Sequence, residues 1–361
     1  MGMAVDHIAD RLRLPRDAHA LHALAVAGAA CVLSMGVAYV GYFPCRAQRG
    51  AQRTSKFDMA RRPRRPAPPR RLHFRAPSLA HLQELSRMRV QAGCELSIET
   101  DTVSPVIAML RPRDGLARWQ VNGRQGFERS LGFDEHVDSF GNRCQRFVLP
   151  AGLTRVRIDT TVETTPDIRV AREAPAVDPA QLPAETLQFL LPSRYCPSDL
   201  GAMWNRARDI TADAAPGYAQ AEAIRQWIAT HLAYRYGVSN ASTDAQATLA
   251  EGAGVCRDFA HVGITLCRAL DIPARMVVGW LHDLEPMDMH AWFEAYLGGT
   301  WYTFDATQSA PRGGRVVIAH GRDAADVAFL TSYRPLRTLS LRVWANLDDR
   351  PGFDEDLGHA A

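Results

Sequence analysis

The chain contains almost no lysine. Lys56 is the only one in 361 residues, and arginine supplies the other basic side chains. Residues 88–361 therefore offer no lysine as an acyl acceptor for self-crosslinking. No two of the seven cysteines have C-x-x-C spacing, so a zinc site or a thioredoxin-like motif is unsupported. Their odd number and irregular spacing argue against a disulfide framework, which favours a reducing compartment. No acidic calcium loop is evident either.

The basic residues are unevenly distributed. The net charge is +3, but residues 1–87 hold 15 basic and 5 acidic side chains, whereas the remainder holds 27 basic and 34 acidic. The larger part is thus mildly acidic and gives no indication of nucleic-acid binding. Otherwise the composition is that of an ordinary globular protein, long enough for two domains.

Residues 1–87 differ from the rest. Leu21–Phe43 is mostly apolar and long enough to span a bilayer, and residues 46–75 then carry eleven basic side chains in a Pro/Arg-rich segment expected to be disordered. A secretory signal is disfavoured because the charge follows the apolar run. Two interpretations remain, a single membrane anchor and a segment that is not native coding sequence. Both predict a cytoplasmic catalytic part, the anchor by the positive-inside rule.

Residues 88–170 predict a small antiparallel β-sandwich. Short alternating segments are expected at 94–100, 106–111, 127–133, 146–149 and 156–162, with turns at 122–123 and 141–142. This region carries no catalytic constellation of its own. A proline-rich run over 165–183 predicts a domain boundary near residue 170. Helices are then expected at 198–213, 217–232 and 245–251.

Cys256 is the first candidate for catalysis. The sequence Gly-Ala-Gly-Val-Cys-Arg-Asp-Phe-Ala-His at 252–261 places two glycines before the cysteine, and apolar residues then recur at helical spacing. Cys256 is therefore expected at a helix start, where free N–H groups and the helix dipole favour a thiolate. Asp258 in the same turn would partly oppose that charge. A lone buried cysteine is more often structural. Residues further along the chain therefore decide between a structural and a catalytic role for Cys256.

His290 and Asp305 lie on two strands joined by a tight turn. Residues 288–297 and 301–305 alternate as strands do, and Gly298-Gly299 is a two-residue hairpin signal. If Leu297 pairs with Thr300, Asp305 lies diagonally from His290 on one sheet face, roughly 7–8 Å between α-carbons. A carboxylate can then fix the imidazole tautomer and leave the other nitrogen for a thiol.

Three ordered motifs resemble the Cys–His–Asp core of the transglutaminase-like superfamily, more narrowly its bacterial branch. They are Gly-Val-Cys256-Arg-Asp-Phe-Ala, His290-Ala-Trp and Trp-Tyr-Thr-Phe-Asp305-Ala-Thr. Segments at 191–197, 272–280, 321–327 and 138–150 resemble the family too. The resemblance implies an α+β fold, a papain-like core of helices followed by an antiparallel β-meander, preceded by the β-sandwich. We expect the catalytic domain at 171–347 and a loose acidic tail at 348–361.

This triad predicts acyl transfer through a thioester on Cys256, with His290 as base and Asp305 orienting it. The expected function is a cysteine-dependent amide or peptide-bond hydrolase or acyltransferase acting on a protein or peptide. Two alternatives are a crosslinking protein-glutamine γ-glutamyltransferase and a non-catalytic binding module. The Cys256 backbone N–H is one expected oxyanion donor; Tyr234, Tyr236 and Asn240 are candidates for the second. The chemistry requires no metal or organic cofactor.

Overall fold

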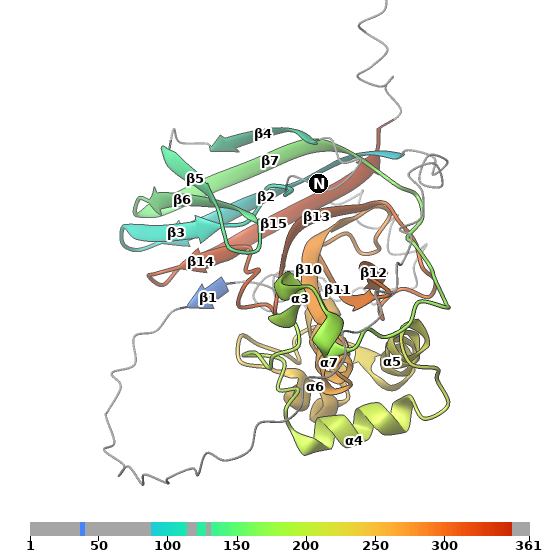
Figure 1. Cartoon of the computed structure of the whole chain (residues 1–361). Coiled ribbons are helices and arrows are strands. Elements are labelled where there is room, and N and C mark those ends of the chain that lie inside the picture. The colour runs from blue at the N-terminus through green and yellow to red at the C-terminus, as the bar shows by residue number, and fades with distance from the viewer. Residues whose placement is uncertain (1–36, 40–87, 114–120, 128–130, 349–361) are drawn as a thin grey trace, which may run out of the picture. The chain divides into compact units, whose positions relative to one another are not determined.

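The computed structural model describes residues 37–39, 88–113, 121–127 and 131–348 (Figure 1). The predictions made for residues 1–87 and for the acidic tail fall outside these ranges, except at strand β1 (Val37–Tyr39) and at Asp348. Among the residues that are described, no helix has the length and apolar character needed to cross a membrane.

Two sheets form the β-rich region. One has the order β15-β2-β7-β4 and is antiparallel throughout. The other has the order β1-β14-β3-β6-β5, and only its β1–β14 pair is parallel. The strand bounds are β2 Met88–Thr100, β3 Ser104–Ala108, β4 Val121–Phe127, β5 Phe133–Val137, β6 Arg143–Leu149, β7 Gly152–Thr164, β14 Leu330–Ser332 and β15 Arg337–Leu347.

Alternation of side chains explains these strands. Val90, Cys94 and Leu96 of β2 are buried and pair with Val162, Ile158 and Val156 of β7, which are buried as well. Because successive side chains of a strand point to opposite faces, one face of each strand lies in the core.

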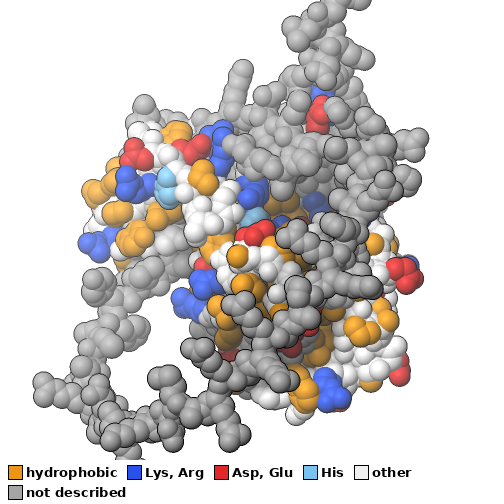
Figure 2. All heavy atoms as spheres, in the orientation of Figure 1, with side chains coloured by type: hydrophobic (Ala, Val, Ile, Leu, Met, Phe, Trp, Pro, Cys, Tyr) orange, Lys and Arg blue, Asp and Glu red, His pale blue; other side chains and the backbone are white. Residues whose placement is uncertain are grey.

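The edge strand β5 is exposed along its whole length. Asp134 and Glu135 on it form ion pairs of 2.8 Å with Arg146 and Arg111, and Figure 2 shows charges of both signs on this part of the surface. Charged, short edge strands disfavour pairing with other chains.

Two sequence-based assignments in this region are wrong. Phe127 ends β4, Phe133 begins β5, and the described residues 131–132 lie outside any strand, so the expected strand at 127–133 is not continuous. Asn122-Gly123 lies within β4 opposite β7 instead of forming a turn. The C-terminal bound of the catalytic domain also needs correction: β14 and β15, expected in that domain, pair with β3 and β2 of the N-terminal region. The predicted boundary near residue 170 stays a prediction.

The second part of the fold combines helices with an antiparallel sheet of order β12-β11-β10-β13. Its strands are β10 Ala274–Leu281, β11 His290–Leu297, β12 Thr300–Phe304 and β13 Arg315–Gly321. The helices are α3 Ala184–Leu187, α4 Gly201–Ile210, α5 Tyr218–His231, α6 Ala245–Glu251 and α7 Cys256–Ala269, with a 3-10 turn at Pro179–Gln181. The expected α+β class, with helices before the cysteine and a meander after it, is confirmed.

Helix α7 is the centre of this part. Residues 256–268 are all buried, since other helices pack around it and β11 lies against one side. Gly263 permits the close contact with the sheet, because a Cβ there would lie 2.4 Å from the ring of Phe293. The buried Arg268 donates to three backbone carbonyls, those of Leu191, Ala274 and Arg322. Helix α7 is therefore held in one position against β11.

Asn142 joins the β-rich region to the sheet of the second part, at strand β13. Its side chain is fully buried, and its Nδ2 donates to the carbonyl of His320 on β13 (2.9 Å). The backbone N–H of His320 donates back to Asn142 Oδ1 (2.9 Å). Asp138 positions Asn142 by accepting from its backbone and side-chain N–H groups. The turn at 138–142 is therefore a structural junction between the sheets.

Candidate active site

Cys256 is the first residue of α7, as the sequence predicts. Helix α6 ends at Glu251, and its C-cap Gly252 has a left-handed backbone (φ 68°). That conformation favours glycine. Two residues, Ala253 and Gly254, form the short strand β9 parallel to β8 (Ala233–Tyr234), and Val255 is the N-cap. This sharp entry places Cys256 where backbone N–H groups have no partner within the helix.

Asp258 stabilises the start of the helix. Its Oδ2 accepts a hydrogen bond from the backbone N–H of Val255 (2.9 Å), and its Oδ1 pairs with Nη2 of Arg257 (2.7 Å). A Cβ on Gly254 would lie 2.6 Å from the Cβ of Asp258, so glycine allows this approach. As expected from the sequence, the charge of Asp258 opposes a thiolate: it is among the charges that raise the pKa of Cys256.

His290 and Asp305 are in direct contact. Nε2 of His290 lies 2.7 Å from Oδ2 of Asp305, and both side chains are buried. The predicted hairpin register is confirmed from Leu297–Thr300 to Phe293–Phe304, and both turn glycines have positive φ. Because Nε2 faces the carboxylate, Nδ1 is the nitrogen left for a thiol.

The sulfur of Cys256 lies at the start of β11. The backbone N–H of Ala291, the residue after His290, donates a hydrogen bond to it. Packing of α7 on β11 therefore brings the helix start and the His290–Asp305 pair together, as the sequence analysis expected. The catalytic roles of the three residues remain predictions.

Burial controls the protonation of the thiol. It raises the pKa of Cys256, the negative charges of Asp288 and Asp305 raise it further, and the Ala291 N–H opposes them. The expectation that the helix start lowers this pKa is therefore wrong for the free site. Desolvation of a thiolate outweighs the dipole here. The thiol is neutral at rest, so a base must take its proton as the sulfur attacks.

The carboxyl of Asp305 is held ionised. Burial alone would raise its pKa, but the charges of His290 and Arg315 and hydrogen bonds from His290 and Thr307 hold that pKa well below its usual range. Thr307 donates to Oδ1 through its backbone N–H (3.0 Å) and its hydroxyl (2.8 Å). One carboxylate oxygen thus faces His290 while the other is fixed by the loop.

Arg315 is a site residue that sequence reasoning missed. Its Nη2 lies 2.9 Å from Oδ2 of Asp305, and its guanidinium stacks over the ring of Trp292 (4.7 Å to the centroid). The contact with Asp305 is a close ion pair between two buried groups. Arg315 is only 6% exposed, so its charge acts in a poorly solvated position. The Gly-Gly pair before it gave no signal of this role.

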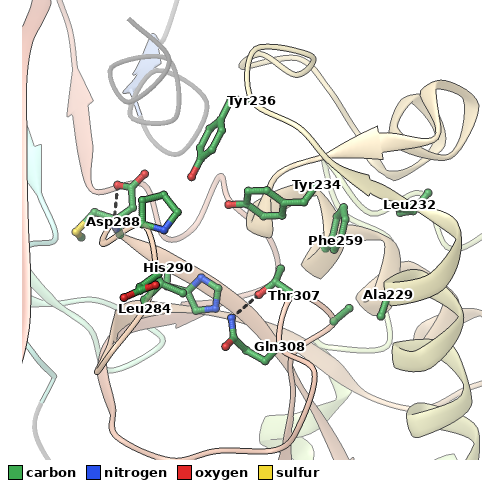
Figure 3. Close-up of a pocket in the computed structure, with 14 residues that line it drawn as sticks. Ala229, Leu232, Tyr234, Tyr236, Phe259, Leu284, Asp288, His290, Thr307 and Gln308 are labelled. Carbon is green, nitrogen blue, oxygen red and sulfur yellow. Dashed lines mark hydrogen bonds between the residues drawn. The ribbon is translucent and has the colours of Figure 1, made fainter. Parts of the chain in front are cut away.

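A cavity of about 290 Å³ opens in front of His290 (Figure 3). Tyr234 and Tyr236, two of the predicted oxyanion candidates, line it. Asn240, the third, is absent from its described lining: its Oδ1 accepts from the backbone N–H and hydroxyl of Ser242, as in an Asx turn. Asn240 therefore serves a turn, and its prediction as an oxyanion donor is not supported by this position.

Comparison with known proteins identifies the family. The model of the transglutaminase-like superfamily matches residues 205–306, which include all three candidate catalytic residues. A solved structure from Cytophaga hutchinsonii, of a protein provisionally named a cysteine protease, is 31% identical, with a TM-score of 0.68, covering 74% of this chain and 93% of its own. The chain belongs to the transglutaminase-like superfamily.

Two further proteins are similar to parts of the chain. An uncharacterised protein of Mycobacterium leprae is 31% identical over 115 residues, 29% of this chain and 41% of that protein. The chain thus spans about two fifths of that curated relative. The periplasmic domain of TgpA from Pseudomonas aeruginosa is 18% identical, with a TM-score of 0.32, covering 62% of this chain.

Across residues 37–39, 88–113, 121–127 and 131–348, no three or more His, Cys, Asp or Glu side chains gather in a way that could hold a metal ion. The expectation that the chemistry needs no metal or organic cofactor stays a prediction.

Proposed function

We propose that this protein is a cysteine-dependent amide or peptide-bond hydrolase or acyltransferase that forms a thioester on Cys256. The observation that carries the proposal is the buried 2.7 Å contact between His290 and Asp305, with the Cys256 sulfur at the adjacent Ala291 N–H. Nucleophile, base and orienting carboxylate are the three parts that acyl transfer through a thioester requires. The provisional name of the Cytophaga hutchinsonii protein supports the hydrolytic reading.

The first half of the reaction forms the thioester. Nδ1 of His290 takes the thiol proton while the sulfur attacks the amide carbonyl, because the thiol is neutral at rest. The imidazolium is stabilised by Asp305 and gives the proton to the leaving nitrogen as the C–N bond breaks. The backbone N–H of Cys256 at the helix start is one donor to the oxyanion.

Tyr234 is the stronger of the two remaining candidates for the second oxyanion donor. It pairs with Gly254 in the β8–β9 ladder, two residues before Cys256, and its ring lies edge-on to Phe259 of α7 (5.8 Å between centroids). Figure 3 shows its hydroxyl directed into the cavity. These contacts fix the phenol near the helix start, which is where an oxyanion donor is needed.

The second half returns the free enzyme. His290 takes a proton from water or an amine, which attacks the thioester carbonyl. The C–S bond then breaks, the acyl product leaves, and His290 returns the proton to the sulfur of Cys256. Water gives hydrolysis and an amine gives transfer. We favour hydrolysis of a protein or peptide substrate, since nothing in the sequence marks a dedicated amine site. Crosslinking of glutamine side chains and a non-catalytic binding role are the alternatives.

Burst kinetics with p-nitrophenyl acetate test the thioester directly. We expect stoichiometric release of p-nitrophenol and one acetyl group on the peptide that contains Cys256, identified by mass spectrometry. Cys256→Ala should abolish both signals, and His290→Ala should slow the burst by about a hundredfold or more. Cys267→Ala is the matched control, because Cys267 is a buried cysteine of the same helix. A full burst in Cys256→Ala would refute the assignment.

A further inference from the structure

We infer that the cavity in front of His290 recognises a positively charged nitrogen carried by the amine half of the substrate. The amine half is the part that leaves when the thioester forms. This inference rests on the proposed function and names the substrate class of that same site: amides or peptides whose leaving amine carries a second, basic nitrogen, as in a peptide with a basic residue directly after the cleaved bond.

The first support is the sign of the charge around the cavity. Asp288 and Glu285 line it, and no Lys or Arg is among the described residues that do so. Asp288 is partly buried and Glu285 is exposed at the mouth. A concave site lined by charge of one sign concentrates ligands of the opposite sign. A cation that enters the cavity is therefore attracted by these two acids, whereas a carboxylate is repelled.

The second support is the aromatic wall opposite these acids. Tyr234 and Tyr236 lie edge to face (5.5 Å between centroids), and Phe259 continues the row beside Tyr234. In Figure 3 both hydroxyls point toward the side of the cavity where Asp288 lies. Phenol oxygens can accept hydrogen bonds from an ammonium or guanidinium group, and aromatic faces attract cations. Aromatic rings facing a carboxylate are well suited to a basic nitrogen.

The position of Asp288 indicates that the charged nitrogen belongs to the amine half of the substrate. His290 delivers its proton to the leaving nitrogen, so that nitrogen must lie beside the imidazole. Asp288 is two residues before His290 on the same segment, and its Oδ1 is fixed by the backbone N–H of Met289 (2.7 Å). On the other side of His290 the lining is neutral, with Thr307 and Gln308. The group attached to the leaving nitrogen is therefore the one within reach of Asp288.

A purely electrostatic role for Asp288 is the competing explanation. Its charge raises the pKa of the Cys256 thiol, so removing it would change the acylation rate without any contact to substrate. The partition of one common acyl-enzyme among several amines separates the two roles. Every amine meets the same thioester, so an effect on the thiol cancels from the ratio, whereas a contact with the amine does not.

The experiment uses the full chain acetylated by p-nitrophenyl acetate and intercepted by three amines of matched length. These are 1,4-diaminobutane, butylamine and 4-aminobutanoate, which present an ammonium, a methyl group or a carboxylate at the far end. Acetylated amine and free acetate are quantified by chromatography. We expect diaminobutane to exceed butylamine by about fivefold beyond the statistical factor for two amino groups, the gain of a partly exposed ion pair. 4-Aminobutanoate should be the poorest acceptor.

Asp288→Asn should remove this preference, leaving only the statistical factor. Asp283→Asn is the matched control: it removes the same charge from the same loop, but Asp283 does not line the cavity and its side chain is 74% exposed. It should keep the preference.

Three results would overturn the inference while leaving the proposed function intact. They are a burst whose thioester no amine intercepts, interception without a preference for diaminobutane, and a preference that persists in Asp288→Asn. Absence of a burst that depends on Cys256 would instead refute the proposed function, and the inference with it.

Discussion

Asp305 is the most heavily constrained side chain of the site. One of its oxygens faces both His290 and Arg315, and the other accepts two hydrogen bonds from Thr307. A carboxylate buried without such partners would lose its charge. Arg315 supplies a permanent positive charge 2.9 Å from this carboxylate. It is a positioning residue that acts through Asp305.

Replacing Arg315 tests this role. Arg315→Met removes the cation from Asp305, so the pKa of the carboxyl should rise. As the pH is lowered, the burst with p-nitrophenyl acetate should then be lost at a higher pH than in the parent protein. Loss of one partner of a buried ion pair should also lower the free energy of unfolding by about 3–5 kcal/mol. The pH profile of the burst rate per folded molecule is the readout.

Arg315→Lys keeps the charge and should return the acid limb toward the parent position. If Arg315→Met lowers stability but leaves the pH profile in place, Arg315 is only a structural residue.

The local sequence was sufficient to predict the contact between His290 and Asp305, because both belong to one hairpin. The Gly298-Gly299 turn fixes the pairing of β11 with β12, which aligns His290 with Asp305. The contact of Arg315 with Asp305 could not be predicted in this way. Arg315 begins β13, which pairs with β10, so two strands, β10 and β11, separate it from β12. Its long side chain crosses the ring of Trp292 to reach Asp305, a contact that no local spacing encodes.

At the scale of elements, α7 shows where periodicity misleads. The spacing of Phe259, Val262 and Leu266 predicts one apolar stripe, but residues 256–268 are buried on every side of the helix. Away from that stripe, Arg257 and Arg268 donate to carbonyls of distant segments, and His261 accepts the backbone N–H of Ala324. A stripe cannot reveal such contacts. In the β-region, the Gly in Asn122-Gly123 suggested a turn, yet β4 is an edge strand that tolerates glycine.

Gly263→Ala tests the contact that holds α7 against β11. The added methyl would overlap the ring of Phe293, since its Cβ would lie 2.4 Å from a ring carbon. We expect the free energy of unfolding to fall by about 1–3 kcal/mol, as overpacked cores do. The burst should slow as well, because Cys256 on α7 would move relative to His290 on β11.

Gly201→Ala is the control for helix glycines. Gly201 begins α4, and no atom lies within 4 Å of its added Cβ. Urea denaturation should give an unchanged or slightly higher stability for it. Equal losses in the two variants would contradict the packing argument.

At the scale of the whole molecule, two buried histidines link folding to pH. His261 stacks on Tyr195 (5.1 Å) and its Nε2 accepts the backbone N–H of Ala324 (3.2 Å). Burial, and then the charge of Arg257, lowers the pKa of His261 to about 3. Burial, and then Arg275 and Arg113, lowers the pKa of His320 to about 2. Both side chains must therefore be neutral for the chain to fold.

The direction of the pH effect follows from these shifts. In the unfolded chain a histidine titrates near its ordinary pKa of about 6.5. Below that value the unfolded state binds protons that the folded state does not, so stability is present above about pH 6.5 and is lost as the pH falls. Each histidine should lower the free energy of unfolding by about 1.4 kcal/mol per pH unit between its unfolded and folded pKa values.

His261→Gln isolates one of these contributions. Glutamine keeps a side-chain acceptor for the Ala324 N–H but does not titrate, so the variant should be less stable near neutrality yet lose less stability on acidification. The difference in slope should be about 1.4 kcal/mol per pH unit between about pH 6 and pH 4, measured by urea denaturation. His136→Gln, on the exposed strand β5, should leave the parental slope unchanged. If the free energy of unfolding of His261→Gln falls with pH as steeply as that of the parent, then His261 is protonated within the folded protein. That result would contradict the argument from its burial on α7.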